Sequence, residues 1–360
     1  MLDRREFLGA AFAAVMAGGG RRPAAARPQA PRRLIIDGLG EIHLDYEMSL
    51  IDQVRASGMR GCVVTVGNPA LQGPTAFDDM RAELEAYDRH IRTHPDRFLR
   101  ATSSSDLDRA AAGSLIGLIY YTQNATPIQD DVERLRTLHD LGVRIVQLTY
   151  NTRNLLGDGC LERTNVGLSR FGVEVVERMN AMRMLVDLSH CGEATTLDGI
   201  TLSKAPVAIT HAGCKAVYDH PRNKSDEVLR KLADRGGVLG IYQINPYLGA
   251  KERNTLDDYL RHVDHAVNVA GIDHVGIGSD REHRTIPDTE EEKQKLIEEL
   301  SRLRPVTAAT FRWPFFISEL NHPRRMETIA EGLTRRGRTS DEIDKVLGGN
   351  WYRLFRETIG

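Results

Sequence analysis

Cysteine is scarce in this sequence, and an excess of charge of either sign is missing. Only four of the 360 residues are cysteine, and none lie in a Cys-x-x-Cys pair, which argues against a disulfide scaffold. The 48 Lys and Arg residues nearly balance the 50 Asp and Glu residues, leaving a formal net charge of −2. Aromatic residues make up 6% of the chain and no basic stripe is interleaved with them, so we expect no nucleic-acid partner.

Long apolar runs are also missing. No segment reaches the ~20 apolar residues that a transmembrane helix needs, so we expect no transmembrane segment. With 41% hydrophobic and 27% charged residues, the chain is long enough to bury a large core, and one α/β barrel suits its length. Cys62 lies in an apolar strand pattern and is predicted to be a small core residue. A disulfide between Cys191 and Cys214 stays an alternative in an oxidising compartment.

The first 30 residues differ from the rest. Arg4-Arg5-Glu6-Phe7-Leu8 precedes a run of small apolar residues and then an Arg- and Ala-rich stretch, which resembles a twin-arginine export signal. The alternative is a disordered Arg/Ala tail. We therefore expect 1–30 to be a signal and tail, residues 31–360 to form one domain, and the protein to be periplasmic or otherwise exported through the twin-arginine route.

Short apolar runs rich in β-branched residues recur between amphipathic stretches. Eight of them are predicted strands, at 34–37, 61–67, 114–121, 143–150, 184–190, 206–211, 237–244 and 274–280. A further strand within 97–106 would change that count by one. Helices are predicted over 169–182 and 225–237, with Ser169 and Ser225 as N-caps. Strand and helix alternating in this way predict an α/β fold, a parallel (β/α)8 TIM-type barrel, with an insertion around 285–325 that forms a lid or wall.

Polar residues at the ends of these strands are the candidate site, because the active site of such a barrel lies at the carboxyl ends of its strands. They are Glu41, Gln123, Tyr150, His190, His211 and Asp280. Two histidines with oxygen ligands at one mouth have the composition of a zinc hydrolase centre. Each residue alone has a structural alternative; Asp280, for example, could cap a helix or pair with Arg281. Other histidines, such as His43, His139 and His262, are interpreted as surface or core residues.

Longer segments carry a resemblance to a known family. They include "LGVRIVQLTYN", "MLVDLSHCG", "APVAITHAG", "DHPRNKSDEVLRKLADRGGVLG", "GIDHVGIGSD" and "KVLGGNWYRLFRE", and they extend over most of residues 33–360. Together they resemble the membrane (renal-type) dipeptidase family of metallopeptidases. The resemblance implies an amidohydrolase-like barrel with two zinc ions that hydrolyses dipeptides. It implies that His190 and His211 are metal ligands, that Asp280 is the acid/base and that Arg222 binds the substrate carboxylate.

The sequence departs from the family at the metal site. The family's His-x-Asp pair after the first strand is Leu39 and Glu41, its bridging Glu is Gln123, and a substrate-facing His is Tyr150. Leu39 cannot bind a metal, and a neutral Gln is a poor bridge between two dications. A shifted frame in which His43 and Asp45 supply the missing pair stays an alternative. We therefore expect one zinc ion, held by His190 and His211 with Gln123, Glu41 or Asp280 completing the ligands.

These features predict an exported dipeptidase-like metallohydrolase that cleaves a dipeptide or a small peptide-derived amide. Asp280 would act as the base, Arg222 would bind an anionic end of the substrate and Tyr150 would contact the substrate and donate to the oxyanion. A non-hydrolytic enzyme acting on a peptide metabolite and a catalytically silent binding protein are the alternatives. The expected partner is a small peptide-like substrate, and a homodimer is left open.

The paired arginines generate the first prediction. Changing Arg4 and Arg5 to Lys should retain the folded protein in the cytoplasm, because twin-arginine export depends on that pair. Fractionation of cells that express either form measures the periplasmic share. Undiminished periplasmic recovery of the double variant would remove the signal interpretation.

Overall fold

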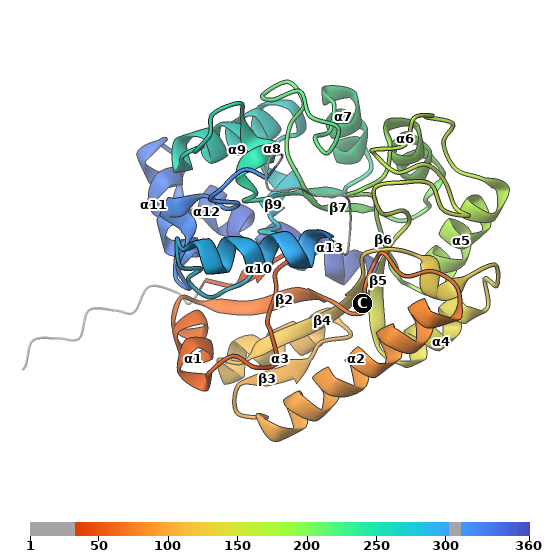
Figure 1. Ribbon diagram of the computed structural model, residues 1–360, viewed down its shortest axis with the longest axis horizontal. Helices are drawn as coiled ribbons and strands as arrows, with labels where there is room; N and C mark the ends of the chain where they lie inside the picture. The colour runs from red at the N-terminus through yellow and green to blue at the C-terminus, as the bar shows by residue number, and fades with distance from the viewer. Residues whose placement is uncertain (1–32, 302–310) are drawn as a thin grey trace, which may run out of the picture. The chain divides into compact units, whose positions relative to one another are not determined.

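Parallel pairing joins eight strands in the order β1-β2-β4-β5-β6-β7-β8-β9, with helices between them (Figure 1). The computed structural model describes residues 33–301 and 311–360, so the predicted signal at 1–30 and part of the predicted insertion lie outside the described residues. The strands are β1 (Ile35–Asp37), β2 (Met59–Thr65), β3 (Phe98–Arg100), β4 (Ile116–Thr122), β5 (Val143–Gln147), β6 (Leu185–Asp187), β7 (Ala208–Ala212), β8 (Val238–Ile241) and β9 (Val275–Ile277). The (β/α)8 prediction is confirmed. The additional strand is β3, which lies beside β5 on the same edge of β4.

The first and last strands meet and bring the sheet close to full closure. The Gly38 N–H donates to the Ile277 carbonyl at 2.8 Å, and the Ser279 N–H donates to the Asp37 carboxylate at 2.8 Å. Trp351 packs against this seam, and its indole N–H also donates to Ile277 at 2.8 Å. A Cβ on Gly38 would lie 2.3 Å from the Trp351 ring, so only glycine allows this approach.

Helices cover the strands on the outside (Figure 1). They are α1 (Met48–Ala56), α2 (Pro74–Thr93), α3 (Ser104–Gly113), α4 (Arg134–Asp140), α5 (Arg170–Ala181), α6 (Glu193–Leu202), α7 (Asp226–Asp234), α8 (Asn245–Leu248), α9 (Leu256–Ala270), α10 (Glu290–Ser301), α11 (Arg325–Arg335), α12 (Ser340–Asp344) and α13 (Asn350–Thr358). The predicted caps are confirmed, because Ser169 accepts the Gly172 N–H and Ser225 accepts the Val228 N–H. Each hydroxyl satisfies a donor that the first helical turn leaves unpaired.

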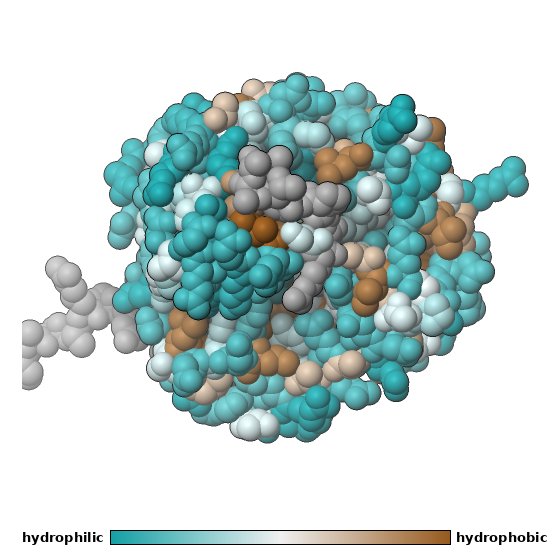
Figure 2. All heavy atoms as spheres, viewed as in Figure 1, coloured by the Kyte–Doolittle hydropathy of each residue, from teal (hydrophilic) through white to brown (hydrophobic). Residues whose placement is uncertain are grey.

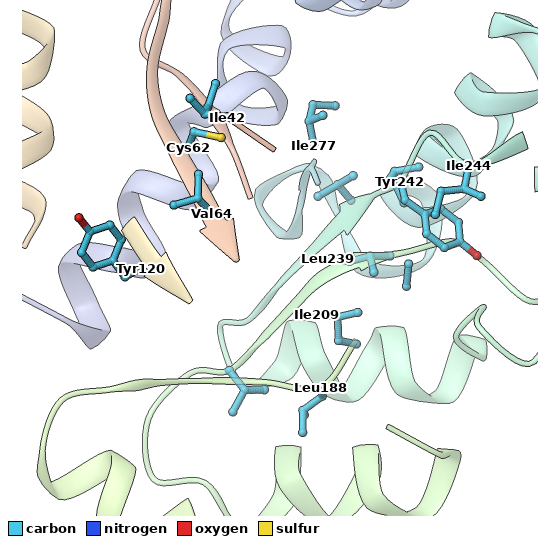
Figure 3. Packing of buried hydrophobic residues seen from close by; sticks show 14 of the residues in the cluster. Ile42, Cys62, Val64, Tyr120, Leu188, Ile209, Leu239, Tyr242, Ile244 and Ile277 are labelled. Atoms are coloured by element: carbon cyan, nitrogen blue, oxygen red, sulfur yellow. The ribbon is translucent and has the colours of Figure 1, made fainter. Parts of the chain in front are cut away.

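Alternation along the strands builds two apolar layers. Cys62 and Val64 of β2 face the layer between strands and helices, to which Ile209 of β7 and Leu239 of β8 also belong (Figure 3). Val63 between them belongs to the other cluster, together with residues of α13. Cys62 is fully buried, as predicted, and all four cysteines are free, so the alternative of a Cys191–Cys214 disulfide is wrong in this structure. Both cysteines belong to the same cluster of buried apolar residues.

The face shown in Figure 2 is mostly hydrophilic, with apolar side chains scattered over it. Within the described part of the chain, no helix combines the length and apolar character that crossing a bilayer requires. After α10, residues 315–317 lie against the segment that follows β8. The Asn245 N–H donates to the Phe315 carbonyl at 2.8 Å, and the Ile317 N–H donates to the Gln243 carbonyl at 3.3 Å. Residues 315–317 of the predicted insertion therefore lie beside the end of β8.

Buried His262 of α9 generates a prediction about stability. Its Nδ1 accepts the Cys214 N–H at 2.9 Å and its Nε2 donates to the Leu248 carbonyl at 3.1 Å, so the ring is neutral. Burial lowers the pKa of His262 to about 4 from its usual 6.5. As the pH falls, the unfolded chain therefore binds a proton at this histidine before the folded chain does. The stability contributed by the neutral ring is present above pH 6.5 and is lost as the pH falls towards 4.

We expect His262→Gln to lower the free energy of unfolding at pH 7 and to flatten its pH dependence. Between pH 7 and pH 4.5, the wild type should lose about 2 kcal/mol more than the variant. Urea denaturation of both proteins at the two pH values measures this. Equal losses of stability in the two proteins would show that the pKa of His262 is not lowered in the folded protein.

Candidate functional site

The predicted site residues gather where the strands end. Glu41 follows β1, Gln123 follows β4, Tyr150 follows β5, His190 follows β6, His211 lies within β7 and Asp280 follows β9. All of these strands run parallel, so their carboxyl ends form one mouth of the barrel. The structure therefore places these residues at strand ends, as the sequence predicts.

Two histidines form the centre of the site. The Nε2 atoms of His190 and His211 lie 2.8 Å apart, and their rings are inclined at 62°. Both are buried, at 6% and 0% exposure. The opposite ring nitrogens have partners of their own: His190 Nδ1 lies 2.8 Å from Asn151 Oδ1, and His211 Nδ1 lies 2.9 Å from Thr210 Oγ1.

The partners of the Nδ1 atoms determine whether each Nε2 atom carries a proton or a lone pair. The Asn151 oxygen accepts, so Nδ1 of His190 carries the proton and Nε2 presents a lone pair. Burial, with the positive charges of Arg222 and Lys224, holds the pKa of His211 well below its usual value, so its ring is neutral. The His211 tautomer then decides the contact: a proton on its Nε2 makes the 2.8 Å contact a hydrogen bond to His190, whereas a proton on its Nδ1 turns both lone pairs towards a cation between them.

Tyr150 covers the histidine pair on one side. Its ring stacks on His190 with 4.3 Å between centroids and 26° between planes. The tyrosine is only partly buried, so part of it is open to solvent beside His190. This position suits the predicted contact with a substrate.

Two buried cations hold the backbone that carries His190. Arg222 donates to the carbonyls of Ser189 at 2.5 Å and His211 at 3.3 Å. Lys224 donates to the carbonyls of Leu188 and Cys191 at 2.9 and 2.8 Å and to Thr196 Oγ1 at 3.1 Å. Arg222 is 3% exposed and also lies over the Tyr242 ring at 5.8 Å. The two carbonyl bonds use two of its five N–H groups, which leaves donors for a carboxylate.

A polar layer inside the barrel lies beneath the histidines. The Tyr121 hydroxyl lies 2.7 Å from both Asp187 Oδ2 and Gln147 Oε1. Gln147 in turn donates to the Gln123 carbonyl at 2.5 Å, which fixes the backbone of that predicted ligand. Burial raises the pKa of Asp187, and hydrogen bonds from Tyr121, Thr210 and other donors oppose that rise.

Sequence reasoning missed this layer together with Asn151, Thr210 and Lys224. A signal was present in two strands. Asp187 interrupts the apolar pattern of "MLVDLSH", and Thr210 interrupts that of "PVAITH". A polar residue within a fully buried strand needs a partner, so both positions pointed to an internal network.

Asp280 and Glu41 lie on the opposite side of the mouth. The Asp280 N–H donates to the Leu39 carbonyl at 2.9 Å, next to β1. Its φ of 51° places it in the left-handed region, as does the 57° of Asn151. Two of the five non-glycine residues with positive φ in the described chain are thus site residues, as is common where function outweighs local strain. Burial, and then the charge of Asp280, raise the pKa of Glu41 well above its usual value.

The structure does not bring every predicted ligand to the histidines. Among residues 33–301 and 311–360, no three His, Cys, Asp or Glu side chains are grouped so that they could hold a metal ion. Glu41 and Asp280 are therefore not joined to the pair as a third ligand of these types. His43 and Asp45, the shifted-frame alternative, are both exposed. Leu39 is fully buried in the core.

These observations test whether a metal fits. Two neutral imidazoles with converging lone pairs and bound outer nitrogens suit one zinc ion, for which Zn–N distances are ~2.0–2.1 Å. Gln123 is 8% exposed, and its amide oxygen is a further candidate ligand, of a residue type other than His, Cys, Asp and Glu. A pair of zinc ions does not fit, because Leu39 has no donor atom and Gln123 has no charge to offset two dications.

Comparison with known proteins gives the family of the chain. The fold and its paired histidines define a barrel hydrolase of the metal-dependent type. Residues 43–312 match the profile of the membrane dipeptidase family, peptidase family M19, and the chain belongs to that family. The resemblance stated from the sequence is thus confirmed.

Individual relatives show how far the similarity extends. Dipeptidase verJ of Clonostachys rogersoniana is 35% identical over 209 residues, which are 57% of this chain and 54% of that protein. An uncharacterised Klebsiella pneumoniae protein from the pqqA 5′ region is 30% identical over 290 residues, 78% of this chain and 96% of its own. A Pseudomonas aeruginosa amidohydrolase structure superimposes with a TM-score of 0.80 and 31% identity, covering 91% of this chain and 97% of its own.

The Arg222 geometry generates the next prediction. Arg222→Lys should weaken binding of ligands with a free C-terminal carboxylate about 10-fold or more and leave their C-terminal amides unaffected, because an ammonium cannot match the planar fork of a guanidinium. Calorimetric titration of carboxylate and amide ligands measures this. Arg353→Lys is the matched control, since Arg353 also donates to two carbonyls, of Gly236 and Asp273, away from the site. Equal weakening of acid and amide would make Arg222 a purely structural residue.

Proposed function

We propose that this chain is an exported hydrolase that cleaves a dipeptide or a small peptide-derived amide with a single zinc ion. The observation that carries the proposal is the pair of buried imidazoles whose Nε2 atoms lie 2.8 Å apart. Family membership supports the reaction class, and the Clonostachys rogersoniana relative is named a dipeptidase. The proposed ion is held by His190 and His211, with the Gln123 amide oxygen and solvent as the remaining donors.

A bound zinc ion supplies two things: it lowers the pKa of a water molecule towards ~7 and it polarises an amide carbonyl. The chain supplies the rest. Asp280, across the mouth from the histidines, is proposed to accept the proton of the attacking water. Its carboxylate lies near enough to Glu41 and Arg222 to shift the pKa of both. Glu41 is left out of the proposed ligands because the structure does not group it with the histidines.

Substrate binding is assigned to the two residues beside His190. Arg222 is proposed to bind the C-terminal carboxylate of the substrate with the N–H groups that the Ser189 and His211 carbonyls leave available. The partly exposed Tyr150 hydroxyl is proposed to donate to the oxygen on which negative charge develops. Its stacking on His190 fixes the ring and so limits the entropy lost in binding.

Export is proposed from the twin-arginine pattern at 4–8 alone. An exported peptidase would meet small peptides outside the cytoplasm. The reaction and the location are separate proposals, since each can fail without the other.

Titration of zinc into metal-free protein tests the function. We expect release of free amine from dipeptides to rise with added zinc and to level off at one ion per chain. His190→Ala and His211→Ala should each lose tight binding and activity, because each removes one of two nitrogen ligands. His43→Ala is the matched control: it removes an exposed histidine near β1 and should keep both properties.

The other outcomes assign the alternatives. Zinc bound at one ion per chain without cleavage of any dipeptide would favour a non-hydrolytic enzyme. No zinc at all would favour a silent binding protein. Two ions per chain, with loss of one in His43→Ala, would restore the shifted frame and overturn the single-ion proposal.

A further inference from the structure

Strands β6 and β7 pair at only one position before they separate. That position joins Asp187 to Ala208. Beyond it, the Asp187 side chain replaces the backbone ladder: Oδ1 accepts the Thr210 N–H at 2.7 Å and Oδ2 accepts from the Thr210 hydroxyl at 3.0 Å. A side chain thus bridges the two strands where the barrel opens towards its mouth.

Ser189, two residues after the end of β6, continues this bridge to His211 of β7. Ser189 Oγ lies 2.7 Å from Asp187 Oδ1, to which it donates, and it accepts the His211 N–H at 3.1 Å. Two successive N–H groups of β7, those of Thr210 and His211, are therefore bound by side chains of the β6 segment. Both strands carry a histidine of the pair just above this point, so the bridge fixes their separation.

Counting protons shows a further effect on His211. Ionised Asp187 is an acceptor only, and the Thr210 hydroxyl has one proton to give, with Asp187 Oδ2 and Ser189 Oγ each 3.0 Å away. When that proton goes to Asp187, the Thr210 oxygen presents a lone pair to His211 Nδ1, 2.9 Å away. Nδ1 must then carry the imidazole proton, which leaves Nε2 with its lone pair towards His190. Which ring nitrogen carries the proton is set by the hydrogen bond at the other one.

We propose that Asp187 and Thr210 are positioning residues that fix the proton of His211 on Nδ1 and so keep Nε2 ready to bind a cation. Asp187 does not contact His211 directly; it acts by orienting the Thr210 hydroxyl. The role of this tautomer in cation binding rests on the proposed function. The tautomer itself is a property of the metal-free protein, so it can be measured independently of activity.

Nitrogen NMR of metal-free protein labelled at histidine tests the proposal, with the His211 signals assigned by their loss in His211→Gln. The wild type should show the proton on Nδ1. Thr210→Val keeps the shape of the side chain and removes its hydroxyl, so the Nε2-protonated form should become the major one. Zinc affinity, measured by chelator competition, should fall about 10- to 100-fold. Thr210→Ser keeps the hydroxyl and should restore both the tautomer and the affinity.

Asp187→Asn tests the other positioning residue. The amide oxygen must face the Thr210 N–H, which turns the NH₂ group towards the Thr210 hydroxyl and removes the acceptor that orients it. The Nδ1 preference should therefore weaken. Tyr121→Phe is the matched control: it removes a 2.7 Å hydrogen bond to the same carboxylate without touching His211. It should lower the urea midpoint and leave both the tautomer and the zinc affinity as in the wild type.

The outcomes separate this inference from the proposed function. A Thr210→Val protein that keeps the Nδ1 proton and wild-type zinc affinity would overturn the inference, whatever its activity. A shift in Tyr121→Phe equal to that in Thr210→Val would also overturn it, because loss of stability alone would then explain both. If the tautomer responds as expected but the zinc-loaded wild type cleaves no dipeptide, the inference stands and the proposed function fails.

Discussion

The whole site depends on keeping two neutral imidazoles close together with their lone pairs converging. When both rings carry their proton on Nδ1, this arrangement is unfavourable by itself, because the site is buried and two lone pairs meet across 2.8 Å. The surrounding structure imposes it. Asn151 and Thr210 occupy the outer nitrogens, and buried Arg222 and Lys224 disfavour a proton on His211. A site that disfavours the charged form of His211 and brings two imidazole nitrogens together is suited to another cation.

Much of the buried polarity of the barrel serves that arrangement. Lys224 and Arg222 have no carboxylate partner among the ion pairs of the described chain, and their charges are balanced by carbonyl oxygens of the loop that carries His190. Burying charges in this way is costly unless every donor is satisfied. Here the cost is offset by hydrogen bonds that hold the backbone at the mouth. The barrel therefore trades some stability for a rigid placement of its histidines.

The strands and the positions of the candidate residues were predictable because they depend on local patterns. Apolar runs of the right length, the caps Ser169 and Ser225, and polar residues just beyond each run required no tertiary information. Orientation did require it. His190 and His211 face each other, whereas Glu41 is turned towards Thr65 and Asp280. These orientations follow from strand register and barrel shear, which cannot be read from any short segment. Asp187 gave a signal of an internal network, but its pairing with Tyr121 and Gln147 was unpredictable for the same reason, since the three residues come from three strands.

X-ray absorption of the zinc-loaded protein is the most direct test of the single-ion centre. The account predicts two imidazole ligands with oxygen donors at the remaining positions, and no metal–metal scattering at ~3.5–4 Å. A metal–metal distance in that range, or a zinc ion with fewer than two imidazole ligands, would contradict it.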